Sequence, residues 1–327
     1  MTDAETGADT GAEQATIAIT GASGLVGTAL RETLEGSGAP LRVLAVSRSR
    51  GPDTVVWSPR RGELDAAALR GVDAVVNLAG ERIGPGRWTE ERKRRIRESR
   101  IEGTRLLVKA FAELPRPPKV LVQASAVGYY GDTGDRWVDE ESPRGEGFLA
   151  SVVEDWEAAS TPAEAMGVRV VRLRFGHVLG KGGLLDAMRT PTKLGLGGRL
   201  GSGRQFWSFI GIVDLVSIIL LALEDADLRG VVNAVAPEPV RNAEFTERFA
   251  KVLHRPAWLP APELGLRLLF GKQQAQEMLL WGQRVRPGVL LERGFEYAWP
   301  TLDDALSAVE GDRIALPLAR AAALKVA

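Results

Sequence analysis

Short apolar runs alternate with amphipathic segments along most of this chain. The runs have the length and the branched residues of buried strands, whereas the segments between them repeat apolar residues at helical spacing. The predicted strands occupy residues 17–19, 41–46, 55–57, 72–78, 120–124, 168–175 and 230–235. The predicted helices occupy residues 25–34, 64–69, 88–111, 145–165, 213–223, 242–253, 264–280 and 302–309. Such alternation predicts an α/β fold with a doubly wound parallel sheet, in which ligands bind at the carboxyl ends of the strands.

The first strand runs into a glycine-rich turn. Residues 16–27 read TIAITGASGLVG, so three glycines separate a strand from a helix. Gly21 permits a tight turn, Gly24 lets the backbone approach a pyrophosphate, and Gly27 lets the helix pack against the strand. The helix directs its free N–H groups and the positive end of its dipole at the phosphates. The pattern predicts an NAD(P)-binding Rossmann domain, with cofactor contacts from Gly21, Ala22, Ser23, Gly24, Leu25, Val26 and Gly27.

Two further strand ends bear on the cofactor. Ser47 and Arg48 follow the second strand, about 20 residues after the glycines, where NAD-binding folds place an acidic residue on the ribose. A guanidinium there binds a 2′-phosphate through two hydrogen bonds, so the sequence favours NADP(H) over NAD(H). The alternative is a solvated loop arginine. The strand at 72–78 ends in small residues whose backbone would border the cofactor, namely Asn77, Leu78, Ala79 and Gly80.

Composition narrows the class of protein. The 327 residues suffice for one large domain or two modest ones, and 42 basic residues balance 42 acidic ones, so nothing attracts nucleic acid or an anionic membrane in bulk. Cysteine is absent and the two histidines are far apart, so no metal site is expected. Residues 1–14 are acidic, small and polar, typical of a disordered tail without a targeting signal. We expect a cytoplasmic protein with a small-molecule partner.

The amino-acid composition changes after the strand at 168–175. Residues 180–203 are rich in glycine and basic residues, which favours a long binding loop, and we expect 182–207 to form a mobile lid over the pocket. The guanidinium groups of Arg199 and Arg204 and the indole of Trp207 would suit a nucleotide or a phosphorylated substrate. Such side chains are equally common on protein surfaces that bind no ligand. A histidine just past the strand end is either a structural hydrogen-bonding residue or a base. The substrate-binding candidates are His177, Arg199, Arg204, Gln205 and Trp207.

Several motifs together resemble a known group. TGASGLVG, NLAG and SAVGYYG resemble the extended branch of the short-chain dehydrogenase/reductase superfamily. RWTEERKRRIRESRIEGT, GGRLGSGRQFWSFI, NAVAPEPV and LERGFEYAWP resemble its atypical, sugar-nucleotide-epimerase-like family, which ends in a small domain of unknown function. The resemblance spans residues 16–306 and implies an NADP(H)-binding Rossmann domain with a smaller, mainly helical C-terminal substrate domain. It implies no particular substrate.

The expected domain organisation follows from this resemblance and from the change in amino-acid composition after residue 175. Residues 15–180 and 204–232 are assigned to the Rossmann domain, and residues 181–203 and 233–312 to the substrate domain. Residues 1–14 and 313–327 are assigned to terminal tails. The order of the last segment, which is rich in alanine and leucine, is left open, as is the oligomeric state.

This sequence departs from the family pattern at two places. The family usually carries an aromatic-Ile-His-Ile-acid-Asp run after the glycine-rich segment, whereas residues 209–214 read FIGIVD and lack the histidine and the first acid. Residues 174–177 read RFGH in place of Arg-Thr-Gly-Val. If these positions line the pocket, the ligand differs from those of the relatives.

The resemblance also implies a set of catalytic residues. Hydride transfer in the superfamily uses a serine and a Tyr-x-x-x-Lys pair, in which tyrosine exchanges a proton and lysine holds the ribose. Ser125 lies at the expected strand end. The place of the pair holds Phe148 and Val152 or, one residue on, Leu149 and Val153, and neither set exchanges a proton.

Tyr129 and Tyr130 are the nearest phenols to Ser125, and each is either a catalytic acid or an aromatic plug. Glu140, Glu141 and His177 are the next alternatives.

The sequence therefore favours an NADP(H)-dependent oxidoreductase or epimerase that acts on a small or nucleotide-linked carbonyl or alcohol without the usual tyrosine–lysine pair. The alternatives are a non-catalytic NADP(H)-binding sensor or regulatory protein and a structural scaffold with a vestigial pocket.

Overall fold

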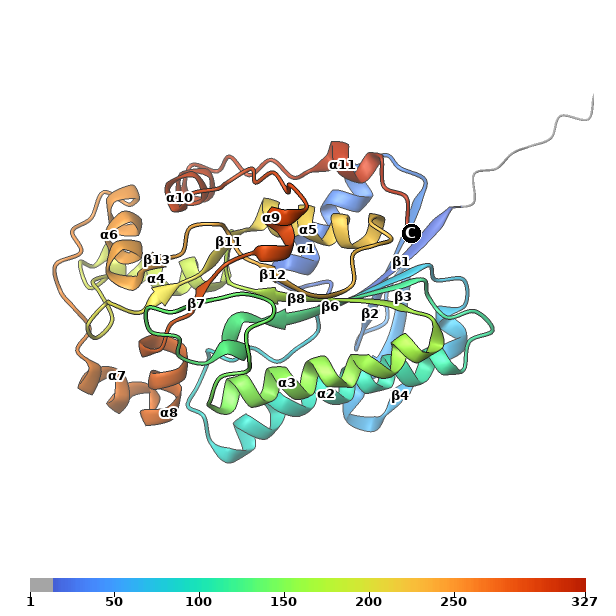
Figure 1. Cartoon of the computed structure of the whole chain (residues 1–327), viewed down its shortest axis with the longest axis horizontal. Coiled ribbons are helices and arrows are strands. Elements are labelled where there is room, and N and C mark those ends of the chain that lie inside the picture. Colours follow the sequence, from blue (N-terminus) through green and yellow to red (C-terminus); the bar gives the residue numbers. More distant parts are fainter. Residues whose placement is uncertain (1–13) are drawn as a thin grey trace, which may run out of the picture.

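The computed structural model describes residues 14–327, and an eight-stranded sheet forms its centre (Figure 1). The strand order is β12-β8-β6-β5-β1-β2-β3-β4, and all neighbours are parallel except the antiparallel pair β3 and β4. The strands are β1 (Ala15–Thr20), β2 (Leu41–Ser47), β3 (Thr54–Ser58), β4 (Glu63–Leu64), β5 (Ala74–Asn77), β6 (Val120–Ala126), β8 (Arg169–Phe175) and β12 (Gly230–Ala234). Of the predicted tail at 1–14, residues 1–13 lie outside the described part.

Helices cover both faces of the sheet, as expected for a doubly wound fold. Figure 1 shows α2 (Glu90–Ala112) and α3 (Phe148–Ser160) below the sheet, and α1 (Leu25–Gly36), α5 (Ile212–Glu224) and α11 (Leu318–Ala322) above it. The predicted N-cap of α2 is confirmed, because the Thr89 hydroxyl accepts a hydrogen bond from the Arg92 N–H at 3.1 Å. The predicted α/β architecture is therefore confirmed.

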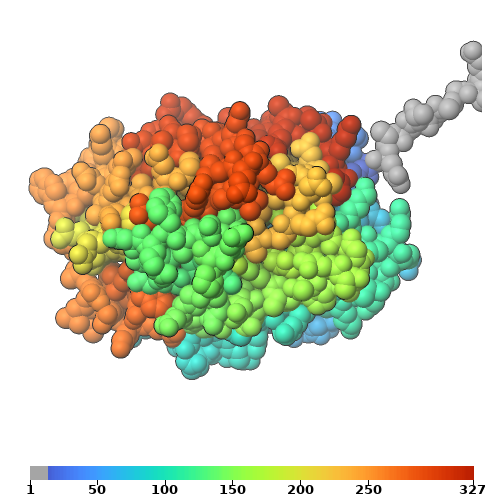
Figure 2. All heavy atoms as spheres, viewed as in Figure 1, coloured from blue at the N-terminus to red at the C-terminus, as the bar shows by residue number. Residues whose placement is uncertain are grey.

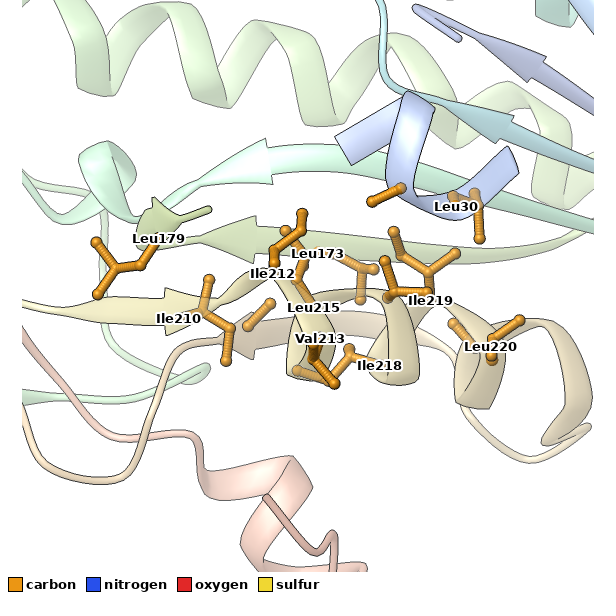
Figure 3. Close-up of a cluster of buried hydrophobic side chains, with 14 of the residues drawn as sticks. Leu30, Leu173, Leu179, Ile210, Ile212, Val213, Leu215, Ile218, Ile219 and Leu220 are labelled. Carbon is orange, nitrogen blue, oxygen red and sulfur yellow. The ribbon is translucent and has the colours of Figure 1, made fainter. Parts of the chain in front are cut away.

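The main core lies between the upper helices and the sheet. Figure 3 shows Leu30 of α1 and Ile219 of α5 close to Leu173 of β8. The same cluster continues into two short strands beyond the sheet, β9 (His177–Leu179) and β11 (Phe209–Gly211), which pair in parallel. Because α5 is buried on nearly all sides, its sequence is apolar around its whole circumference.

The C-terminal region is mainly helical, as predicted. Its elements are α4 (Gly183–Lys193), β10 (Phe206–Trp207), β13 (Val240–Arg241), α6 (Asn242–Val252), α7 (Glu263–Phe270), α8 (Lys272–Ala275), a π-helix (Gln276–Leu280), β14 (Arg284–Val285), α9 (Gly288–Glu292) and α10 (Leu302–Glu310). The short strand β7 (Trp137–Val138) pairs with β14. No helix within residues 14–327 combines the length and the apolar character needed to cross a membrane.

The prediction of one long loop at 180–203, continued as a lid to residue 207, is wrong. Residues 183–193 form α4, which buries Leu185 completely against the core. The glycines that suggested a loop flank this helix, at residues 180–183 and 195–203, and Pro191 lies in its last turn. At the other end of the predicted lid, Trp207 is a buried strand residue.

Three smaller differences separate the predicted elements from the observed ones. The helix predicted at 264–280 is interrupted at Gly271, whose φ of +87° is incompatible with a continuous helix. The helix predicted at 64–69 is only a 3₁₀ turn at Ala66–Leu69. The tail at 313–327 is ordered against the fold, since Ala321 of α11 is fully buried and the Arg169 guanidinium donates to the Ala327 carbonyl at 3.0 Å.

A buried carboxylate holds the last part of the chain against α5. Asp214, in the first turn of α5, accepts hydrogen bonds from the N–H groups of Ala298 at 2.6 Å and Trp299 at 3.1 Å. Burial raises the pKa of Asp214 to about 6, although these two N–H groups act in the opposite direction. Asp214 therefore ties two segments that are distant in sequence.

Replacing Asp214 with alanine is expected to lower the free energy of unfolding by about 2–4 kcal/mol, because two backbone donors lose their acceptor inside the protein. Urea unfolding at neutral pH measures this difference. Asp227→Ala removes an exposed carboxylate on the α5–β12 connection and should change stability by less than about 0.5 kcal/mol.

The loss should also depend on pH. The folded pKa of Asp214 lies above its ordinary value of 3.8, so the native state favours the protonated form of this carboxyl. The stabilisation that Asp214 gains from protonation is complete below pH 3.8 and is lost as the pH rises through about 6. The difference between wild type and Asp214→Ala should therefore be larger near pH 4 than near pH 7. An equal difference at both values would contradict this account.

Candidate functional site

The glycine turn between β1 and α1 is packed backbone against backbone. Gly21 has a φ of +65°, and a Cβ on it would lie 2.9 Å from the carbonyl carbon and oxygen of Leu78. A Cβ on Gly27 would lie 2.3 Å from the Gly21 carbonyl oxygen. The sequence predicted that Gly27 lets α1 pack against the strand. The atoms nearest to its Cβ position belong instead to the turn, at Gly21 and Ala22. The turn is fixed against the end of β5.

Gly24 differs from these two glycines. A Cβ on Gly24 would meet only the Gly21 oxygen, at 3.3 Å, and both Gly24 and Ser23 are exposed. Gly24 is the N-cap of α1, and within the described chain no side chain caps this helix and no acidic residue lies in its first turn. The N–H groups of a helix N-terminus are thus presented at an open rim, which suits an anion.

The two neighbouring strand ends reach the same edge of the sheet. Arg48 follows the last residue of β2, is exposed, and makes no hydrogen bond or ion pair with any other side chain of residues 14–327. Ser47 accepts a hydrogen bond from the Ser49 N–H at 3.3 Å. Beyond β5, the N–H groups of Leu78 and Ala79 each donate to the Thr20 hydroxyl at 3.0 Å.

Two of the predicted cofactor contacts in the next segment have different surroundings. Gly80 is exposed, whereas the Asn77 side chain is buried in a polar network. The Asn77 amide oxygen accepts from Thr20 at 2.6 Å, and its NH₂ group donates to Thr104 at 3.0 Å and to Gln123 at 2.9 Å. The Asn77 side chain therefore joins β1, β5, α2 and β6, and the residue is almost completely buried between two paired strands.

Ser125 takes part in a buried ion-pair network. Its hydroxyl donates to Glu157 at 2.5 Å, and the side chain is 2% exposed. The Arg174 guanidinium donates to both oxygens of Glu157 at 2.8 Å. Ser125 therefore holds the carboxylate that neutralises Arg174, and its hydroxyl does not face an open pocket.

Tyr130 belongs to the same network. Its hydroxyl accepts a hydrogen bond from Arg174 at 2.9 Å and donates to the Asn233 side chain at 2.8 Å. Burial raises the pKa of Tyr130 to about 12, despite the opposing effect of Arg174. A phenol with this pKa and two protein partners is poorly suited to exchange protons with a ligand.

Tyr129 is placed differently. It is half-buried, and the Arg174 guanidinium lies 3.5 Å from the centre of its ring. The rings of Tyr129 and Tyr130 meet edge to face at 5.4 Å. The contacts with Arg174 and Tyr130 fix the ring of Tyr129. Its hydroxyl, unlike that of Tyr130, makes no hydrogen bond within the described chain.

The expected place of the tyrosine–lysine pair is apolar and closed. A Cβ on Gly128 would lie 3.7 Å from Leu149, so the start of α3 faces the turn that follows β6. The N–H groups of Phe148 and Leu149 donate to Glu277 of the π-helix at 3.0 and 2.8 Å. This carboxylate satisfies the first turn of α3 from a segment more than a hundred residues away.

Sequence reasoning missed Glu157, Arg174, Asn233 and Glu277 as members of the site. Glu157 carried a usable signal, since a lone acidic residue on the apolar face of a helix implies a buried partner. The other three are recognised only once strands and helices are brought together.

The remaining acid–base candidates, Glu140, Glu141 and His177, have different surroundings. Glu140 accepts from the N–H groups of Asn233 at 2.9 Å, Gly288 at 3.1 Å and Val289 at 3.3 Å, and burial raises its pKa. Glu141 is exposed. Burial lowers the pKa of His177 to about 4, so this imidazole is neutral at pH 7.

The substrate-binding candidates fall into two groups. His177 and Trp207 lie together, with ring centres 4.7 Å apart, and the Gln205 NH₂ group donates to the carbonyls of Leu200 and Leu279. Arg199 and Arg204 are exposed instead. No group of three or more histidine or acidic side chains among residues 14–327 is arranged to hold a metal ion.

At one departure from the expected family pattern, the structure has no room for a side chain. A Cβ on Gly211, where the family usually has histidine, would lie 2.4 Å from the Trp299 ring. The indole occupies the space that a side chain at 211 requires. Trp299 is itself held by Asp214 through its backbone N–H.

Comparisons with known proteins agree with this geometry. Residues 17–234 match the NAD dependent epimerase/dehydratase family, and residues 261–309 match a domain of unknown function, DUF1731. The chain is 43% identical over 293 residues to an epimerase family protein of Mycobacterium bovis, covering 89% of this chain and 96% of that protein. It is 41% identical over 298 residues to the human epimerase family protein SDR39U1, covering 90% and 99%.

A solved structure shows the same arrangement. The crystal structure of human SDR39U1 (isoform 2) with NADPH superimposes with a TM-score of 0.83 at 38% identity, covering 91% of this chain and 99% of that one. Fold, motifs and relatives thus agree, and the chain belongs to the NAD-dependent epimerase/dehydratase family, with a C-terminal DUF1731 domain.

Proposed function

We propose that this chain binds NADP(H) along the rim formed by Ser23, Gly24 and the first turn of α1. The observation that carries the proposal is Gly24, the exposed residue at an uncapped helix N-terminus, where a Cβ would meet only the Gly21 oxygen, at 3.3 Å. Arg48 at the end of β2 is the residue proposed to hold the 2′-phosphate. The human relative crystallised with NADPH supports this choice of cofactor.

The proposed reaction is oxidation, reduction or epimerisation of a small or nucleotide-linked carbonyl or alcohol. The bound cofactor would supply or accept hydride. The chain would position the reacting carbon and move a proton, and Tyr129 is the proposed acid because its hydroxyl has no protein partner while Arg174 holds its ring. Ser125 is proposed as a positioning residue that acts through Glu157 and Arg174. Further substrate contacts are proposed from His177, Arg199, Arg204, Gln205 and Trp207.

A non-catalytic NADP(H) sensor is the second candidate. It is favoured by the apolar side chains at either register of the missing pair, Phe148 and Val152 or Leu149 and Val153. The engagement of Ser125 and Tyr130 in internal hydrogen bonds favours it too. Such a protein would bind the cofactor without turning it over. The two candidates share the cofactor rim and differ only in the role of Tyr129.

Gly24→Val is expected to weaken NADPH binding by about a hundredfold or more with the melting temperature unchanged, because the new side chain would fill the space of the pyrophosphate. Calorimetric titration measures the affinity. The matched variant Gly27→Val should instead unfold more easily, since its Cβ would lie 2.3 Å from the Gly21 oxygen. Wild-type affinity in Gly24→Val would refute the assignment of the rim.

Arg48→Asp is expected to reverse the preference for NADPH over NADH, because a carboxylate repels the 2′-phosphate and accepts hydrogen bonds from a ribose hydroxyl. Binding of both cofactors is compared for each variant. Arg116→Asp makes the same charge change on the exposed loop before β6 and should leave the preference intact. A preference for NADPH that survives in Arg48→Asp would exclude this role.

Tyr129→Phe is expected to lower turnover of a carbonyl panel by about 10²–10⁴-fold while NADPH affinity stays the same, because the proposed proton donor is lost. Consumption of NADPH is followed by its absorbance. Tyr130→Phe should mainly lower stability, since Asn233 and Arg174 lose a buried partner.

Full activity in Tyr129→Phe would exclude it as the acid. Tight NADPH binding by wild type, with no turnover of any carbonyl, would establish the sensor in place of the enzyme.

A further inference from the structure

A hollow lies in the C-terminal region, and its lining includes no residue of the proposed cofactor rim. It has a volume of about 550 Å³ and is lined by residue 199, by the outer face of α6 and by the linker that follows this helix. Figure 2 shows α6 and this linker, in orange, at the left end of the molecule. None of the lining residues belongs to the glycine turn, to the end of β2 or to the network around Arg174.

The walls of the hollow are fixed by backbone contacts. The Gly201 N–H donates to the Ala261 carbonyl at 2.9 Å, and the Ala261 N–H donates to the Arg199 carbonyl at 2.9 Å. A Cβ on Gly198 would lie 2.2 Å from the Leu259 carbonyl oxygen, so the linker is pressed against this segment. The opposite wall is helical, and the hollow is therefore part of the fold.

Positive charge predominates around the hollow. Arg199, Lys251 and Arg255 line it, and none of them forms an ion pair with another residue of the described chain. Glu247 is the one carboxylate among the lining residues, and it lies one helical turn before Lys251. Three cations against one anion favour a negatively charged ligand.

An indole completes the lining. Trp258 is 86% exposed, although tryptophan is normally buried on at least one face. A planar ring stacked on this indole would remove apolar surface from water, and aromatic side chains bind nucleobases in this way. Phosphate oxygens would then reach the neighbouring guanidinium and ammonium groups.

We propose that this hollow binds a nucleoside phosphate, with its base on Trp258 and its phosphates on Arg199, Lys251 and Arg255. The volume falls within the range of small-molecule sites. Inorganic phosphate alone leaves the indole unused. The site shares none of its lining residues with the proposed cofactor rim or with Tyr129, and Arg199 is the one residue that it has in common with the substrate contacts proposed above.

The test is a calorimetric titration of the full chain with UDP, ADP and inorganic phosphate, at saturating NADPH so that the cofactor rim is filled. At least one nucleotide should bind more tightly than phosphate. Trp258→Ala and Lys251→Ala should each weaken that binding by about tenfold or more, since one removes stacking and the other a charged contact. NADPH affinity should not change in either variant.

Matched controls remove a tryptophan and a lysine side chain at positions away from the hollow. Trp137→Ala deletes a half-exposed indole on β7, and Lys109→Ala an exposed lysine on α2, and both should bind nucleotide like wild type. Melting temperatures verify that the variants are folded. Absence of nucleotide binding at millimolar concentration, equal affinity for phosphate and nucleotide, or wild-type affinity in Trp258→Ala and Lys251→Ala would each overturn the proposal.

Discussion

The ion pair between Arg174 and Glu157 is the interaction on which the site depends. Both side chains are buried, and breaking such a pair by removing one partner typically costs about 3–5 kcal/mol, because the other charge remains in a medium of low dielectric constant. The pair joins β8 to α3, while Ser125 connects it to β6 and Tyr130 connects it to β12 through Asn233. The carboxyl ends of three strands are thereby held in register with one helix.

Close backbone contact supplies the second constraint at this edge. The turn after β1 is packed against Leu78 and against its own helix, with no room for side chains at Gly21 or Gly27. Gly24, between them, is exposed, and a Cβ on it would meet only the Gly21 oxygen, at 3.3 Å. Rigid packing on two sides of the turn leaves a helix N-terminus presented at the third, which is how one short segment combines stability with an anion-binding surface.

Carboxylates join the C-terminal region to the sheet domain. Asp214 holds residues 298–299, Glu277 caps α3, and Glu140 accepts from three N–H groups at β12 and α9. Each of them accepts from backbone donors that lie far away in sequence, so each joint is specific for one geometry. One of these joints also holds the indole of Trp299 in the space that a side chain at residue 211 would require.

The sequence by itself determined the alternation of strands and helices, the parallel sheet, the glycine turn and the exposed arginine after β2, because these depend on local periodicity and on backbone freedom at single residues. It mistook residues 183–193 for a loop, since nearby glycines masked a helix that Leu185 stabilises only by burial in the core. Tertiary structure alone decided that Ser125 and Tyr130 are held in an internal network while the Tyr129 hydroxyl is not. Whether a polar side chain faces a ligand or a buried partner depends on groups that come together only on folding, and no local pattern carries that information.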